Sequence, residues 1–132
     1  MIEFETIQIT KVEVAEQLLT SFEEQGFTYL HFKYYAPPKY SDGGWVNIWK
    51  TSYIVRGETE LKLIDAINIP FAPQRHCFSK IGQRLNFVLV FPAIPKDWAS
   101  FDFFERCERN RIGFSITNIC RNNTGIYKLL IS

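Results

Sequence analysis

The chain has few cysteines, almost no charge imbalance and no long hydrophobic run. Its 132 residues include three cysteines, and 15 basic residues nearly balance 14 acidic ones, for a formal net charge of +1. Nucleic-acid binders normally carry a clear basic excess or stripe, so this balance argues against a nucleic-acid partner. No segment approaches the ~20 consecutive apolar residues that a transmembrane helix needs. We therefore predict neither a nucleic-acid partner nor a membrane span.

The start of the chain has no features of a secretion signal. Residues 1–5 include two glutamates where a signal peptide is basic, and no apolar stretch follows. If Met1 is the native start, we expect a cytoplasmic protein with free thiols. If a leader has been removed, the expected compartment is secreted or periplasmic, and Cys107 and Cys120 become a candidate disulfide pair.

Motifs for catalysis and for cofactor binding are also missing. The sequence contains no phosphate-binding glycine loop and no G-x-S-x-G element. The spacing of its histidines and cysteines matches no zinc pattern. We therefore predict no enzyme activity, no cofactor and no metal site. One alternative is a small hydrolase-like enzyme that uses His76 with Asp102 or Glu105.

Aromatic residues and alternating strands are what the chain has in abundance. Aromatic residues make up 16% of the sequence and hydrophobic residues 46%. In residues 85–91, apolar side chains occupy every second position, and Pro92 follows directly. Side chains alternate between faces along a strand, and proline cannot donate to a sheet ladder, so a strand is predicted to end here. The same alternation, with turn residues between the segments, predicts strands over residues 1–10, 27–36, 45–55, 61–64, 84–91, 100–105, 111–119 and 126–131.

The predicted strands are separated by turns rather than by helical crossovers. This favours a mainly β fold, an antiparallel β-sandwich of about seven strands. Residues 11–26 fit both a helix and a strand, and we favour a short N-terminal helix over residues 14–25. The chain has no linker and no internal repeat, so residues 1–132 are predicted to form a single domain.

Six short motifs follow one another between residues 33 and 119. They are Gly44-Trp45, Ser52-Tyr53, residues 66–70, residues 75–78, residues 87–96 and residues 101–105. In this order they resemble bacterial immunoglobulin-like β-sandwich domains of unknown function. Those domains often sit beside enzymes or in secreted proteins, so the resemblance implies an immunoglobulin-like sandwich with a non-catalytic, accessory role. It identifies no active-site residues.

A strip of aromatic residues is the feature that points to binding. If residues 45–55 form one strand, its two tryptophans and its tyrosine lie on one face. Further tyrosines precede and occupy the 37–44 loop, which is rich in proline and glycine. The candidate ligand-binding residues are Tyr34, Tyr35, Tyr40, Trp45, Trp49 and Tyr53.

This aromatic face has two interpretations that the sequence leaves open. It is either the inside of the sandwich or an exposed platform that stacks on sugar rings or on partner side chains. We predict a non-catalytic binding or protein-interaction module that recognises a protein or a glycan through this face and the 37–44 loop. A further alternative is a structural subunit that forms a homodimer through a sheet face.

Overall fold

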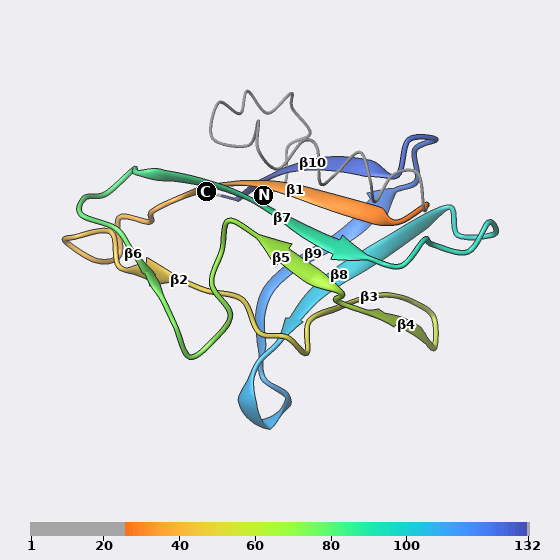
Figure 1. The fold of residues 1–132 in the computed structure, drawn as a ribbon, viewed down its shortest axis with the longest axis horizontal. Coiled ribbons are helices and arrows are strands. Elements are labelled where there is room, and N and C mark those ends of the chain that lie inside the picture. The colour runs from red at the N-terminus through yellow and green to blue at the C-terminus, as the bar shows by residue number, and fades with distance from the viewer. Residues whose placement is uncertain (1–25, 132) are drawn as a thin grey trace.

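The computed structural model describes residues 26–131, and this part of the chain is mainly β (Figure 1). The strand predicted over residues 1–10 and the helix predicted over residues 14–25 lie outside the described residues. Within the described range, the only helical element is the short 3-10 turn η1 (Glu108–Asn110). The same residues contain no helix with the length and hydropathy required to cross a membrane.

One four-stranded sheet has the order β10-β1-β7-β5. Its strands are β10 (Ile126–Ile131), β1 (Thr28–Tyr35), β7 (Arg84–Phe91) and β5 (Asp65–Ile67). β1 and β7 pair antiparallel over eight residue pairs, and both were predicted correctly as strands. β1 and β10 pair in parallel, which the antiparallel prediction missed. The two strands enter the sheet side by side, since the Tyr29 amide donates to the Gly125 carbonyl at 2.8 Å.

The second four-stranded sheet has the order β4-β3-β8-β9. Its strands are β4 (Thr59–Lys62), β3 (Tyr53–Arg56), β8 (Ser100–Arg106) and β9 (Ile112–Cys120). The predicted hairpin between β3 and β4 is confirmed. Arg56 pairs with Thr59, and Gly57 occupies the intervening turn at φ 60°. A positive φ at this first turn position is the conformation that glycine adopts without steric cost.

The single strand predicted over residues 45–55 is wrong. The segment divides into β2 (Trp45–Val46) and β3, and β2 pairs only with β6 (His76–Cys77). Between them, the amide and the hydroxyl of Ser52 both donate to the Trp49 carbonyl, at 3.0 and 2.7 Å, which closes a turn. Trp45, Trp49 and Tyr53 therefore do not share one face of a strand.

The two four-stranded sheets share one hydrophobic core, in which phenylalanine rings pack across the interface. The Phe32 ring of β1 lies 4.9 Å from the Phe87 ring of β7 and 5.5 Å from the Phe103 ring of β8. On β8, Phe101 packs edge-on against Tyr127 of β10 at 5.1 Å. The core thus accounts for most of the aromatic residues in the described part of the chain.

All three cysteines are free thiols. Cys107 directly follows β8, whereas Cys120 ends β9 and pairs with Ser100 at the start of β8. The two cysteines therefore lie at opposite ends of the β8–β9 hairpin. Because a disulfide needs Cα atoms within about 7 Å of each other, the Cys107–Cys120 pair considered from the sequence does not form.

Candidate binding site

The structure separates the six predicted binding residues into three groups. Tyr34 is 7% exposed and belongs to the core, where its ring packs against Phe78 and Phe114 at 5.8 and 5.5 Å. Tyr35, Trp49 and Tyr53 are half-buried. Tyr40 and Trp45 are 50% and 47% exposed, among the most exposed large hydrophobic side chains of the described residues. This last pair is the most exposed of the six.

Tyr40 and Trp45 line the same surface hollow, which has a volume of about 310 Å³. Asp42, Gly44 and Cys77 complete its wall. At its edge, the Arg75 guanidinium lies 4.1 Å from the centroid of the Trp45 ring, a cation–π contact. We call these residues, Tyr40, Asp42, Gly44, Trp45, Arg75 and Cys77, the Tyr40–Trp45 surface.

A glycine turn holds the two aromatic side chains in place. Gly43 and Gly44 have φ values of 84° and 70°, which glycine adopts far more readily than other residues. The Gly44 amide donates to Asp42 Oδ1 at 2.9 Å, and the Gly43 amide donates to the Tyr40 carbonyl at 3.0 Å. A Cβ atom at Gly44 would lie 2.7 Å from Tyr40 Cδ2, so the tyrosine ring packs directly over this glycine. The sequence Ser-Asp-Gly-Gly therefore builds one wall of the hollow.

Strand pairing supplies the other wall. Trp45 of β2 pairs with Cys77 of β6, and the Phe78 amide donates to the Gly44 carbonyl at 2.9 Å. This pairing brings Arg75 onto the Trp45 ring. Sequence reasoning missed Arg75 and Cys77 because both belong to a distant segment, and a two-residue strand leaves almost no alternation to detect.

Trp49 contributes to a different part of the molecule. It lines a separate cavity of about 370 Å³ together with Cys107, Glu108, Arg109 and Arg111. Its backbone amide donates to Glu105 Oε2 at 3.2 Å. The predicted aromatic strip is therefore not one continuous platform.

Glu105 is an acidic side chain that the fold buries. It is 5% exposed, and its carboxylate accepts hydrogen bonds from the amides of Trp49 and Phe114, the latter at 3.1 Å. Burial raises the pKa of this carboxyl group above its ordinary value, and the two amide donors partly oppose that rise. The side chain thereby links β8 to the turn before β3 and to β9.

The residues of the enzyme alternative have separate partners. His76 packs edge-on against Phe78 at 5.1 Å, and Asp102 Oδ1 accepts a hydrogen bond from the Asn118 amide at 2.7 Å. In the described part of the chain, no hydrogen bond or ion pair joins His76 to Asp102 or to Glu105. Among residues 26–131, no group of three or more His, Cys, Asp or Glu side chains is arranged to hold a metal ion.

Comparisons with protein families, with curated proteins and with solved structures find no match to this chain.

Proposed function

We propose that this protein is a non-catalytic interaction module that binds a segment of a partner protein at the Tyr40–Trp45 surface. One observation carries the proposal: two exposed aromatic side chains, from a turn and from a neighbouring strand, line one hollow, and an arginine stacks on one of them. Tryptophan, tyrosine and arginine are the residue types that dominate binding energy in protein interfaces.

The construction of the surface favours binding. Glycine turns and strand pairing already hold Tyr40 and Trp45, so little conformational entropy would be lost when a partner docks. A hollow of about 310 Å³ suits one apolar or aromatic side chain of the partner. The Asp42 carboxylate in its wall would favour a basic residue beside that side chain.

A protein segment fits this surface better than a glycan does. Sugar rings stack on open aromatic faces, whereas the Arg75 guanidinium already lies 4.1 Å over the Trp45 ring. The accessory role agrees with the immunoglobulin-like sandwich that we infer from the motif order of residues 33–119. The two four-stranded sheets around one core support that inference.

Selection from a displayed random-peptide library on the folded protein tests the proposal. We expect enriched peptides that bind the wild type and bind Trp45→Ala at least about tenfold more weakly, because hot-spot residues contribute this much or more. Ile64→Ala is the matched control, since Ile64 is 46% exposed and does not line the hollow. Peptides that bind Trp45→Ala and the wild type equally would contradict the proposal. If no peptide is enriched, but the wild type binds a glycan that Trp45→Ala does not bind, the surface would instead be assigned to a glycan.

A further inference from the structure

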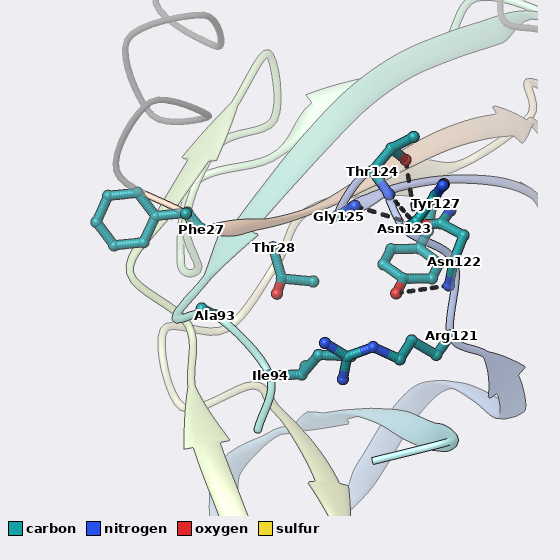
Figure 2. A pocket seen from close by; sticks show the side chains of 11 residues that line it. Phe27, Thr28, Ala93, Ile94, Arg121, Asn122, Asn123, Thr124, Gly125 and Tyr127 are labelled. Atoms are coloured by element: carbon teal, nitrogen blue, oxygen red, sulfur yellow. Dashed lines mark hydrogen bonds between the residues drawn. The ribbon is translucent and has the colours of Figure 1, made fainter. Parts of the chain in front are cut away.

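A second cavity, of about 400 Å³, opens where three chain segments end side by side (Figure 2). The start of β1, the residues after β7 and the 121–125 connection between β9 and β10 form its walls. This cavity shares no lining residue with the Tyr40–Trp45 surface. Its volume lies within the range of small-molecule sites.

Arg121 brings a fixed positive charge to this cavity. Its Nη1 atom donates to the Pro95 carbonyl at 2.6 Å and to the Trp98 carbonyl at 3.2 Å, which holds the guanidinium in one position. Figure 2 shows the guanidinium reaching into the space beside Ile94. A guanidinium has five N–H donors, so donors remain beyond these two bonds. No carboxylate in the described part of the chain pairs with Arg121, and the cavity lining contains no acidic residue.

Two hydroxyl groups face the same space. Thr28 is 2% exposed, and its hydroxyl has no hydrogen-bond partner in the described structure. Figure 2 shows this hydroxyl directed into the cavity. The Tyr127 hydroxyl accepts a hydrogen bond from the Asn122 amide at 3.2 Å, which leaves its own proton available to donate. The Thr28 oxygen is not among the fully covered polar atoms, so this hydroxyl is accessible from the cavity and can donate to a ligand.

The rim of the cavity is held by the side chain of Asn122. Its Oδ1 accepts from the amides of Thr124 and Gly125 at 3.1 and 3.0 Å, and its Nδ2 donates to the Ile126 carbonyl at 2.7 Å. These bonds close the turn and position Tyr127 behind it. The donors are therefore arranged before any ligand arrives, which reduces the cost of binding.

We propose that this cavity binds the anionic end of a small ligand, a carboxylate or a phosphate group. The Arg121 guanidinium would supply the positive charge, and the hydroxyls of Thr28 and Tyr127 would donate to the oxygen atoms of the anion. Hydrogen bonds to a charged acceptor are about twice as strong as those between neutral groups. The site is independent of the proposed partner-protein surface.

Titration of the 15N-labelled protein with inorganic phosphate and with acetate, against sodium chloride of equal ionic strength, tests this site. We expect saturable shifts of the Thr28, Arg121 and Thr124 amides, with a Kd on the order of 1 mM for at least one of the two anions. Saturation by phosphate alone assigns a phosphate group, and saturation by acetate alone assigns a carboxylate.

Thr28→Val removes the hydroxyl and keeps the shape of the side chain. It should weaken binding about threefold to tenfold, as expected for the loss of one hydrogen bond. The control is Thr117→Val, the same change at an exposed site of β9 that does not line the cavity. If neither anion saturates, the cavity does not bind anions and the proposal is wrong. If Thr28→Val binds as tightly as the wild type, the Thr28 hydroxyl does not contact the anion, which contradicts the proposed site.

Discussion

At the scale of single residues, Glu105 is a buried carboxylate whose two oxygens are both hydrogen-bonded. Its two carboxylate oxygens accept amide hydrogen bonds from segments on either side, and a Cβ atom at Gly113 would overlap Oε1. The absence of a side chain at Gly113 is therefore what gives Glu105 room beside β9.

Glu105→Gln is expected to lower the free energy of unfolding by about 1–3 kcal/mol, because the amide group can accept at only one of its two positions and leaves a buried N–H unsatisfied. Urea unfolding measures the change. Glu58→Gln, in the exposed turn of the β3–β4 hairpin, serves as the control. Equal stabilities of the two variants would show that the two amide bonds do not stabilise the fold.

The burial of His31 predicts that the stability of the fold depends on pH. The residue is buried, and neither ring nitrogen has a hydrogen-bond partner in the described part of the chain. Burial, with a smaller contribution from Lys128 opposite it on β10, lowers the pKa of the imidazole from 6.5 to about 4. The unfolded chain therefore takes up a proton first as the pH falls. As the pH falls from the unfolded-state pKa of 6.5 to the folded-state pKa of about 4, the free energy of unfolding should therefore decrease by up to about 3 kcal/mol.

Urea unfolding of the wild type and of His31→Leu across this pH range measures that loss. The raised pKa of Glu105 acts in the opposite direction, since it lowers stability as the pH rises. The difference between the two proteins isolates the contribution of His31. Parallel pH profiles would contradict the prediction.

At the scale of elements, the β3–β4 hairpin depends on the backbone of Gly57. Gly57 has a φ of 60°, and a Cβ atom added there would meet no heavy atom within 4 Å. Gly57→Ala should therefore destabilise the protein through backbone strain alone, by about 1 kcal/mol. Thermal unfolding measures the effect, with Glu58→Ala as the neighbouring control. An unchanged midpoint for Gly57→Ala would mean that the turn relaxes without cost.

Elements with strong local alternation could be predicted from the sequence. β7, β8, β9 and β10 occur within a residue or two of their predicted bounds because each buries one face against the shared core. The segment over residues 45–55 alternates equally well and is nevertheless broken. Its turn is set by the bonds from Ser52 to the Trp49 carbonyl and by the amide of Ile48 donating to the Pro70 carbonyl. Such tertiary pairing overrides a strand preference that is visible only locally.

At the scale of the whole molecule, the aromatic residues divide between core and surface. Of the ten phenylalanines in residues 26–131, six are buried in the core that the two sheets share, as the composition predicts. The composition does not predict that Trp45 and Tyr40 are exposed. Alternation along a strand separates its two faces but does not show which face is buried. Arg75 could not be placed beside Trp45 without the pairing of β2 with β6.

This division predicts effects of very different size on stability for two tryptophan substitutions. Trp98 is 5% exposed and packs against Phe101, so Trp98→Ala should lower the free energy of unfolding by about 3–5 kcal/mol. Trp45→Ala should lower it by at most about 1 kcal/mol, since Trp45 is 47% exposed and its stacking partner Arg75 forms a surface cation–π contact. Guanidinium unfolding distinguishes the two. A large loss in Trp45→Ala would make Trp45 a structural residue rather than a binding residue.

The most direct test of the proposed binding surface is acrylamide quenching of tryptophan fluorescence, in the wild type and in Trp45→Phe, with and without a selected peptide. Only three tryptophans contribute to the signal. We predict a red-shifted, readily quenched component that the peptide protects and that Trp45→Phe lacks. If that component persists in Trp45→Phe, or if a bound peptide leaves its quenching unchanged, the Tyr40–Trp45 surface is not the binding site.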